Sequence, residues 1–241
     1  AGHGGPSRAE ARLRGRRVVW SEPPPTGGNA RRRARGSNSL PRMNSTVAAP
    51  RLVLADVIPG ARVRDALLVC AGAGLTALGA QISIHVPPSP VPITGQTLAV
   101  VMAGAALGAR RGMLSQLLYL CLGLFLPIYS DGGSGTEVIF GATGGYIVGF
   151  IFAAGLMGWF AERGFDRNPL MAFAGFALAQ LAIFGIGVPW LHAFTELTWS
   201  EAIHNGFTIF IVGGLIKAAI GSVTVPAAWR FVRRLEENDR S

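Results

Sequence analysis

The sequence predicts an all-α fold, an integral membrane bundle of six transmembrane helices with both the N and C termini in the cytoplasm. Three observations lead to this prediction. Half of the 241 residues are hydrophobic and only 15% are charged, which is typical of a chain whose main solvent is lipid. Six apolar stretches can each cross about 30 Å of hydrocarbon at about 1.5 Å of helix rise per residue. The basic residues of the connecting loops all fall on one side of the bundle.

The uncharged stretches of the sequence locate the predicted helices. The predicted spans cover residues 66–84, 92–109, 112–130, 138–161, 168–191 and 205–229. The second span is short and begins in the stretch VPPSPVPITGQT. Its outer end is therefore expected to be irregular backbone, which a membrane protein tolerates only where protein or a water-filled cavity covers it.

Glycines recur every four residues in the fourth span and around the second. They are Gly141, Gly145 and Gly149, and Gly104, Gly108 and Gly112. Small residues at this spacing let two helices approach closely, which is how helices associate when lipid removes the hydrophobic drive. Tight packing within one bundle is favoured over a dimer interface as the role of these glycines.

The orientation of the bundle follows from its loops. Basic residues occur before the first span, between the second and third, between the fourth and fifth, and after the sixth. These residues are Arg51, Arg62, Arg64, Arg110, Arg111, Arg163, Arg167, Arg230, Arg233, Arg234 and Arg240. The other three connections contain acids and histidines but no Lys or Arg. Because cytoplasmic loops carry the excess of Lys and Arg, both termini are predicted to be cytoplasmic.

The formal net charge of +9 belongs mainly to the first 50 residues, which hold ten arginines against two glutamates. Residues 1–42 contain prolines, glycines and an RRRAR cluster but no apolar period, so they are predicted to be disordered. No apolar run of a secretory signal follows the arginines. Three interpretations are open: an arm attracted to anionic lipid, an arm for nucleic acid, or a start codon assigned too early, since Met43 opens the next segment. Nucleic acid is the least favoured of the three and is not expected as a partner.

Four segments follow from these patterns. They are a disordered Arg-rich extension over 1–42, a cytoplasmic lead-in over 43–65, the six-helix membrane domain over 66–230, and a cytoplasmic C-terminal tail over 231–241.

Neither a metal site nor a catalytic constellation is predicted. Cys70 and Cys121 lie inside apolar runs and are expected to be small packing residues rather than a disulfide. The four histidines are scattered, and no buried pair of carboxylates or nucleophile with its base can be found. An enzyme is therefore not expected.

Lys217 is the single lysine of the chain and the one ionisable residue deep inside a predicted span. It lies twelve residues from both Asn205 and Trp229, which is about 18 Å of helix in each direction. A buried ammonium costs a few kcal/mol and should face a cavity or a partner. The alternative is that the sixth span starts later and the side chain extends to the headgroups. A lysine can hardly reach them from mid-helix, so a functional role is favoured.

Lys217 does not fit the phosphate-binding loop of an ATPase. That loop needs glycine-rich backbone followed by Lys and then Ser or Thr, but here the sequence reads GGLIKAA inside an apolar helix. The chain is therefore not expected to hydrolyse ATP by that route, and energy must come from another subunit or an ion gradient.

Other polar side chains inside the spans are most simply hydrogen-bond partners between helices. They are Gln96, Gln116, Tyr119, Thr143, Tyr146 and Gln180. Gln96 and Tyr146 are expected nearer the outer surface, where they can line a pocket. Asp131 lies in the stretch SDGGSGT, which is a candidate lid.

Two segments carry motifs of a known family. Residues 86–135 have the pattern Pro-Val-Pro-x-Thr-x-Gln-Thr, a glycine-ending helix, a basic loop and a Leu/Tyr-rich helix. Residues 140–150, FGATGGYIVGF, contain a Thr-Gly-Gly-Tyr element. Together these two segments resemble the BioY family. With six spans, the resemblance covers approximately residues 65–230. The residues on motif positions are Thr94, Gln96, Thr97, Thr143, Gly144, Gly145 and Tyr146.

The resemblance implies the biotin-capture (S) component of an energy-coupling-factor vitamin importer, a multi-pass protein of the cell membrane. Biotin is then the transported substrate rather than a cofactor, and no cofactor is implied. The implied partners, besides the lipid bilayer, are a transmembrane coupling protein and two cytoplasmic ATPase subunits. Two alternatives remain, a capture component for a different vitamin and a membrane-embedded enzyme.

The resemblance also implies roles for individual residues. The ligand-binding residues would be Gln96, Thr143, Gly145, Tyr146 and Lys217, and the small residues Ala73 and Ala77 of the first helix would dock the coupling protein. The family often carries Asp-x-x-Lys on its sixth helix near the ligand carboxylate. Here Lys217 matches the Lys but Gly214 stands at the Asp position, so Lys217 alone is expected to pair with the carboxylate.

Overall fold

The computed structural model describes residues 62–238, besides Ala1. The chain divides into one unit over residues 1–47 and a second over 48–241, and the fold described below belongs to the second unit. The predicted extension over 1–42, most of the lead-in over 43–65 and the last three residues lie outside the described residues.

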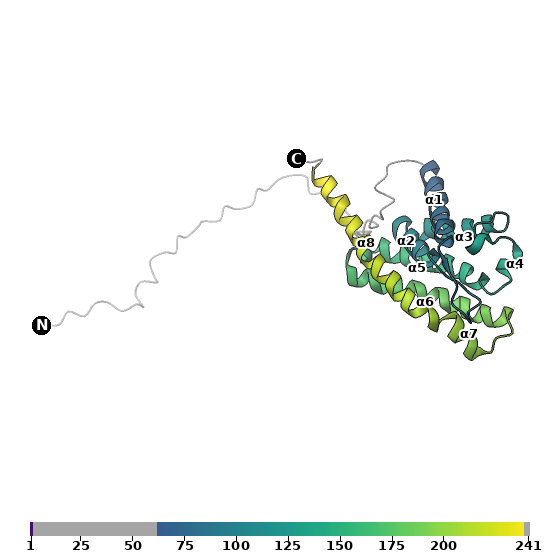
Figure 1. The fold of residues 1–241 in the computed structure, drawn as a ribbon. Coiled ribbons are helices and arrows are strands. Elements are labelled where there is room, and N and C mark those ends of the chain that lie inside the picture. The colour runs from purple at the N-terminus through teal and green to yellow at the C-terminus, as the bar shows by residue number, and fades with distance from the viewer. Residues whose placement is uncertain (2–61, 239–241) are drawn as a thin grey trace, which may run out of the picture. The chain divides into compact units, whose positions relative to one another are not determined.

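Helices make up most of the described part of the chain (Figure 1). In order, the elements are α1 (Arg62–Ala80), β1 (Ser83–Ile84), β2 (Ile93–Thr94), α2 (Gln96–Leu107), α3 (Ala109–Gly123), η3 (Ser130–Gly132), α4 (Thr136–Ile139), α5 (Gly144–Glu162), η4 (Phe165–Arg167), α6 (Pro169–Phe194), α7 (Trp199–Gly206), η5 (Thr208–Phe210) and α8 (Ile211–Asn238).

The described part is therefore a mostly helical membrane protein, as predicted. It contains four candidate spans that are long and apolar enough to cross a membrane. They are Val63–Ala80, Gly144–Glu162, Pro169–Phe194 and Trp199–Leu235. Helices α2 and α3 also overlap predicted spans, but they have 12 and 15 residues and are shorter than the 18 residues that the other spans reach. A helix of 12 residues rises about 18 Å, less than the hydrocarbon thickness of about 30 Å.

Several helix boundaries differ from the predicted spans: α1 covers residues 62–80 instead of 66–84, and α5 begins at Gly144 instead of residue 138. Helix α3 ends at Gly123 instead of residue 130, and Pro127 soon after it cannot continue a helix. The last span is broken near its start, because Phe207 has φ −132° and ψ −56°, which separates α7 from η5 and α8. At its other end α8 continues to Asn238, so the first part of the predicted C-terminal tail is helical.

The outer end of the second span is irregular backbone, as predicted. Strands β1 and β2 form a two-residue antiparallel pair with Ser83 opposite Thr94, and α2 begins only at Gln96. Val91 and Thr94 are buried, so protein covers this segment as its backbone polar groups require.

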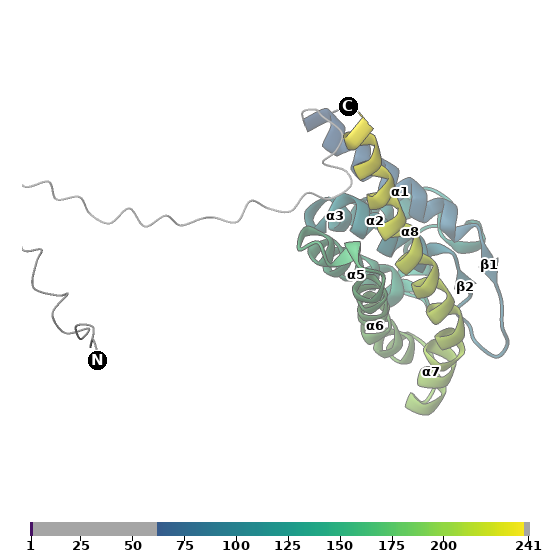
Figure 2. The ribbon, with the colours of Figure 1, turned by 90° about the vertical axis from the view of Figure 1, so that its left-hand side faces the viewer.

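Close helix contacts explain the spaced glycines. A Cβ at Gly104 would lie 2.5 Å from the carbonyl oxygen of Ala154, and a Cβ at Gly149 would lie 3.0 Å from the Cα of Ile183. These positions let α5 approach α2 on one side and α6 on the other (Figure 2). Gly104 and Gly149 thus serve helix packing within one chain.

One end of the bundle gathers four connections. Three polar contacts join the start of α1, the α2–α3 junction, the α5–α6 junction and the last turns of α8. The contacts are Arg111 Nη1 to Asp65 Oδ1 (3.5 Å), the Ala109 N–H to Glu162 Oε1 (2.8 Å) and the Trp229 Nε1–H to Asp166 Oδ2 (2.6 Å). The basic connections of the described residues therefore meet at the same end.

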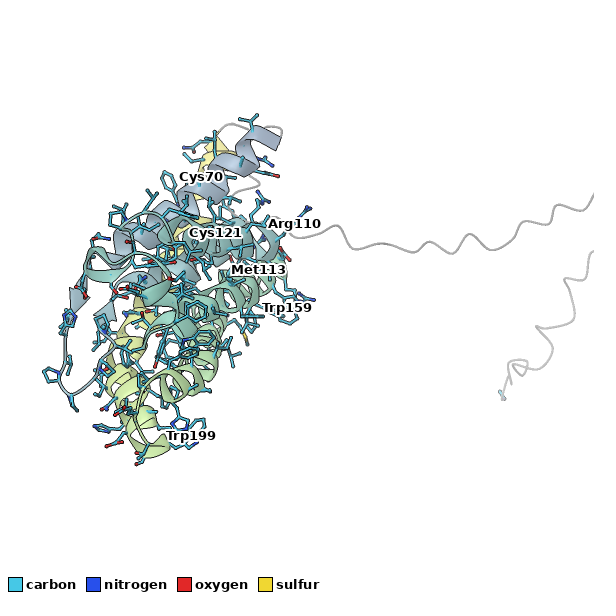
Figure 3. The ribbon with its side chains drawn as sticks, turned by 90° about the vertical axis from the view of Figure 1, so that its right-hand side faces the viewer. Cys70, Arg110, Met113, Cys121, Trp159 and Trp199 are labelled. Carbon is cyan, nitrogen blue, oxygen red and sulfur yellow. The ribbon has the colours of Figure 1, made fainter. Side chains whose placement is uncertain are left out.

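The outer surface of the bundle is strongly apolar (Figure 3). Cys70 and Cys121 are both free and exposed there, so they face the surroundings of the bundle, contrary to the expectation that they pack inside it. Trp159 lies on this surface with the guanidinium carbon of Arg163 3.5 Å from its ring centroid. Such an amphipathic pair is typical of a membrane–water interface.

Candidate functional site

A cavity lies where the start of α2, the start of α5, the middle of α6 and the first turns of α8 meet. Its walls are Val91, Pro92, Thr94, Gln96, Thr97, Ser130, Thr143, Tyr146, Ile147, Phe150, Phe184, Phe210 and Lys217. The walls are mainly apolar with a few polar groups, which is the usual composition of a small-molecule site. The centres of water molecules can occupy about 40 Å³ in it. A single water needs about 10–15 Å³ by this measure, so a larger ligand requires the walls to move.

Lys217 points into this cavity from α8. Its Nζ donates to the carbonyl oxygen of Thr94 at 2.6 Å and to the hydroxyl Oγ1 of Thr97 at 2.8 Å. Both acceptors are neutral, and no carboxylate among the described side chains lies at ion-pair distance from Nζ. The side chain is half-buried and is held inside the bundle, so it does not extend to the headgroups.

Gln96 anchors a hydrogen-bond chain behind the cavity. It begins α2 and is 6% exposed. Its Oε1 accepts from the Thr94 hydroxyl at 2.8 Å, and its Nε2 donates to the hydroxyl of Tyr119 at 2.6 Å. The Tyr119 hydroxyl in turn donates to the Ile128 carbonyl at 3.3 Å. Both the oxygen and the nitrogen of the Gln96 amide therefore have hydrogen-bond partners, and the amide orients Thr94, whose carbonyl oxygen accepts from Lys217.

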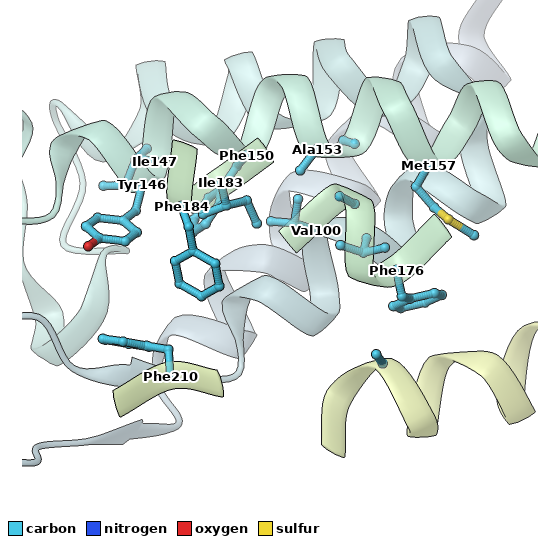
Figure 4. Close-up of a cluster of buried hydrophobic side chains, with 14 of the residues drawn as sticks. Val100, Tyr146, Ile147, Phe150, Ala153, Met157, Phe176, Ile183, Phe184 and Phe210 are labelled. Atoms are coloured by element: carbon cyan, nitrogen blue, oxygen red, sulfur yellow. The ribbon is translucent and has the colours of Figure 1, made fainter. Parts of the chain in front are cut away.

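Aromatic rings form another wall of the cavity. Tyr146 of α5, Phe184 of α6 and Phe210 of η5 contact one another with ring centroids 5.9 to 6.4 Å apart (Figure 4). The Tyr146 hydroxyl donates to the Gly206 carbonyl at 2.9 Å, so it ties α5 to the end of α7. Thr143, the N-cap of α5, is less constrained because its hydroxyl reaches the Val138 carbonyl only at 3.4 Å.

Two loops approach the cavity from its outer side. The segment between β1 and β2 is joined to α7 by the Ser89 hydroxyl, which donates to the Asn205 carbonyl at 2.7 Å. The segment between α3 and α4 contributes Ser130 to the cavity wall, and its next residue, Asp131, lies 3.2 Å from His85 Nε2. Asp131 has φ 57°, in the left-handed region, and lies within the short helix η3. The predicted lid stretch thus lies beside the cavity.

The structure brings four of the five predicted ligand residues to this cavity. Gln96, Thr143, Tyr146 and Lys217 line it, but Gly145 does not. A Cβ at Gly145 would overlap the side chain of Trp190, so this glycine permits the contact of α5 with α6. The contact with Trp190 gives Gly145 a role in helix packing, and the expected ligand contact of Gly145 stays a prediction.

The predicted docking residues of the first helix face inward. Ala73 is 3% exposed and belongs to the core, and Ala77 is partly buried against it. The exposed stripe of α1 contains Leu67, Leu75 and Leu78 instead. Ala77 still borders a shallow groove, together with Gly74 and Leu78.

Several residues of the cavity were not predicted to bind the ligand. Thr94 and Thr97 accept hydrogen bonds from Lys217. Both stand on motif positions, so the motif could have identified them as cavity residues. The aromatic residues Phe184 and Phe210 carried no such signal, because phenylalanine occurs throughout the apolar spans.

Comparison with known proteins places the chain among its relatives. The family model described as the BioY family matches residues 47–234. This chain belongs to the BioY family. Its match covers nearly the whole described bundle, and every residue of the cavity.

Individual BioY relatives are similar over most of their own length. The "Biotin transporter BioY2" of Lactococcus lactis subsp. cremoris is 35% identical over 157 residues, which cover 65% of this chain and 85% of the relative. The "Biotin transporter BioY" of Rhizobium etli is 34% identical over 169 residues, 66% of this chain and 90% of the relative.

A solved structure shares the fold of the bundle. It is the crystal structure of the S-component for biotin from an ECF-type ABC transporter, with a TM-score of 0.63 and 24% identity. The similarity covers 70% of this chain and 92% of that chain.

Proposed function

We propose that this chain binds biotin with high affinity and serves its uptake as the substrate-capture component of an energy-coupling-factor transporter. The observation that carries the proposal is Lys217, a cation directed into a largely apolar cavity and held only by neutral partners. Membership in the BioY family, whose relatives are called biotin transporters, supports a transporter and not an enzyme.

Biotin matches the chemistry of the cavity at both ends. Its carboxylate pairs with the ammonium of Lys217, which has three donors and uses two of them on Thr94 and Thr97. Its ureido ring both donates and accepts hydrogen bonds. Thr143 is the best placed of the predicted partners, since its own hydrogen bond is long, whereas Gln96 must exchange an existing partner. The apolar chain between the two ends lies along Phe150, Phe184 and Phe210.

We further propose six membrane-spanning helices with cytoplasmic termini in the cell membrane. The contacts that gather the basic connections at one end of the bundle support this orientation, because basic loops favour the cytoplasm. Helices α2 and α3 complete the six, with the segment before α2 covered by protein on the outer side.

The proposed partners are a transmembrane coupling protein and two cytoplasmic ATPase subunits. The structural relative is the S-component of an ECF-type ABC transporter, which supports this assignment. We place the coupling contact on α1, at the groove beside Ala77, because Ala73 is buried in the core.

Binding of labelled biotin to the purified full chain tests the proposal. Saturable binding at nanomolar to low micromolar concentration is expected, with competition by unlabelled biotin and none by other vitamins such as riboflavin or thiamine. Binding of another vitamin in place of biotin would make the chain a capture component for that vitamin. Absence of saturable binding for biotin would refute the proposal.

A further inference from the structure

A shallow apolar groove lies between α3 and α5, apart from the ligand cavity. Its walls are Met113 of α3 and Phe152, Gly155, Leu156 and Trp159 of α5, and the centres of water molecules can occupy about 320 Å³ in it. Met113, Phe152 and Trp159 are 39%, 53% and 42% exposed, so the groove opens on the outer surface of the bundle. It shares no residue with the cavity that holds Lys217.

Gly155 shapes the floor of this groove. A Cβ at this position would lie 2.8 Å from Cγ and 2.9 Å from Sδ of Met113. The missing side chain therefore lets Met113 lie against the backbone of α5. Because a methionine is unbranched and flexible, the floor can adapt its shape to an acyl chain.

Two arginines flank one end of the groove. The guanidinium carbon of Arg163 lies 3.5 Å from the ring centroid of Trp159, and its Nη1 donates to the Trp159 carbonyl at 3.3 Å. Arg110 stands in the first turn of α3, three positions before Met113, and residues at that spacing share a helix face. Figure 3 shows Arg110, Met113 and Trp159 on the same side of the bundle. Arg110 is exposed, and no carboxylate among the described side chains lies at ion-pair distance from it.

The acid that the structure describes at this end of the groove is Glu162. Its Oε1 accepts from the Ala109 N–H at 2.8 Å, so it joins the end of α5 to the start of α3 and brings Arg110 and Arg163 to the same end. Two guanidinium groups against one carboxylate leave a net positive charge there. An apolar groove that ends in positive charge beside a tryptophan is complementary to a lipid with an anionic headgroup.

We infer that an anionic phospholipid binds at this groove, with one acyl chain against Met113 and Phe152 and its phosphate beside Arg110 and Arg163. A guanidinium donates two parallel hydrogen bonds to a phosphate, which favours arginine at such a site. A zwitterionic lipid offers the same acyl chain, so the negative net charge of the headgroup determines the preference. The lipid site is independent of the vitamin that the cavity binds, and it goes beyond the proposed function.

Quenching of Trp159 fluorescence by brominated lipid tests this inference in the full chain. The chain is reconstituted into vesicles of dioleoylphosphatidylcholine that contain a rising fraction of dibrominated phosphatidylglycerol, or of dibrominated phosphatidylcholine for comparison. Trp159 is one of five tryptophans, so its signal is the difference between the native chain and Trp159→Phe. Each basic residue near an anionic lipid contributes about fivefold in binding, so we expect a preference of at least about fivefold for phosphatidylglycerol.

The variants separate a built site from general attraction to a basic surface. The preference is expected to fall below about twofold when Arg110→Gln and Arg163→Gln are combined. Arg110→Gln alone leaves the contact of Arg163 with Trp159 in place and should give an intermediate value. The matched control combines Arg230→Gln and Arg233→Gln on α8, which removes the same charge from a helix that does not line the groove and should keep the native preference.

Three outcomes would overturn the inference. One is equal quenching by both brominated lipids in the native chain. Another is an equal loss of preference in the variants of the groove and in the control on α8, which would mean general attraction only. The third is no quenching of Trp159 by either lipid, which would mean that protein, such as a second copy of the chain, covers this face.

Discussion

The ammonium of Lys217 is costly to place inside the described bundle. An ammonium inside a membrane protein must be solvated by protein groups, and two neutral oxygens supply part of that solvation here. Its third donor remains for a ligand. Thr94 contributes its backbone carbonyl to the lysine and its hydroxyl to Gln96, so one residue holds both the cation and the amide behind it.

Replacing Lys217 by Met keeps most of the side-chain volume and removes the charge. Loss of one partner of a hydrogen-bonded charge pair costs about 2–5 kcal/mol, or about 30-fold to several-thousand-fold in affinity. We therefore expect Lys217→Met to weaken biotin by at least about 30-fold and biotin methyl ester far less, as measured by equilibrium binding. Lys217→Arg, which keeps the charge, is the control. Equal losses for both ligands in Lys217→Met would mean that the lysine is structural.

At the scale of elements, the sequence predicted the helices better than their ends. The length of the apolar stretches located the six helical regions. The prolines near Val91 indicated the irregular backbone before α2. The break at Phe207 was not predicted, although Asn205 and Gly206 directly before it are residues typical of a turn. In the structure the Tyr146 hydroxyl donates to the Gly206 carbonyl and so fixes this position.

The same limit applies to the site. Polar residues in an apolar sequence pointed to Gln96, Thr143, Tyr146 and Lys217, since each polar group in lipid needs a partner. Gly145 shares the motif with Thr143 and Tyr146, but its role depends on Trp190, which lies 45 positions later in the chain. A spacing pattern cannot tell a ligand contact from a helix contact when both fall on the same turn.

Helix α8 is fixed at its other end by Asp166. This carboxyl is 0% exposed, its Oδ2 accepts from Trp229 Nε1 at 2.6 Å, and the guanidinium of Arg167 lies 4.4 Å from the Trp229 ring. Burial raises the pKa of the Asp166 carboxyl above its ordinary value, although the hydrogen bond from Trp229 and the charge of Arg167 oppose this shift.

A raised pKa makes the charged form of Asp166 unfavourable in the folded state. Its stabilising contribution is therefore present in full below the ordinary pKa of an aspartate and is lost as the pH rises through the raised value. We expect Asp166→Asn to keep the acceptor for Trp229 but to reduce the gain in thermal stability as the pH falls toward the ordinary pKa of an aspartate. Melting temperatures of both proteins in the same detergent at several pH values measure this. Identical pH profiles would contradict it.

Asp166→Leu leaves the Trp229 N–H without its acceptor. This variant should lower the free energy of unfolding by about 1–3 kcal/mol at all these pH values.

At the scale of the whole molecule, the junctions that carry arginines and the ligand cavity lie at opposite ends of the described bundle. The junctions that carry arginines meet at the end held by Asp166 and Trp229. The cavity lies toward the other end, where Ser89 and His85 connect the loops. This polarity agrees with the proposed function, in which substrate enters from outside and energy is supplied from the cytoplasm.

Cysteine labelling in intact cells tests the proposed orientation. Cys70 and Cys121 are exposed and must first be replaced by alanine. In that background, Ser130→Cys is expected to react with an impermeant maleimide from outside, and Arg163→Cys only after the cells are opened. Reaction of Arg163→Cys from outside would reverse the topology, and Ser130→Cys in opened and intact cells serves as the matched control.

The small space inside the cavity has a kinetic consequence. Because the space inside is only about 40 Å³, we expect the loops on the outer side of the cavity, which the His85–Asp131 and Ser89–Asn205 contacts join, to separate when a ligand enters. The apparent affinity is then the intrinsic affinity reduced by the fraction of molecules that are open. Association becomes a gated event whose rate is set by how often the loops part. The same contacts, once reformed around biotin, slow its escape and so lengthen the time for which the carrier remains loaded.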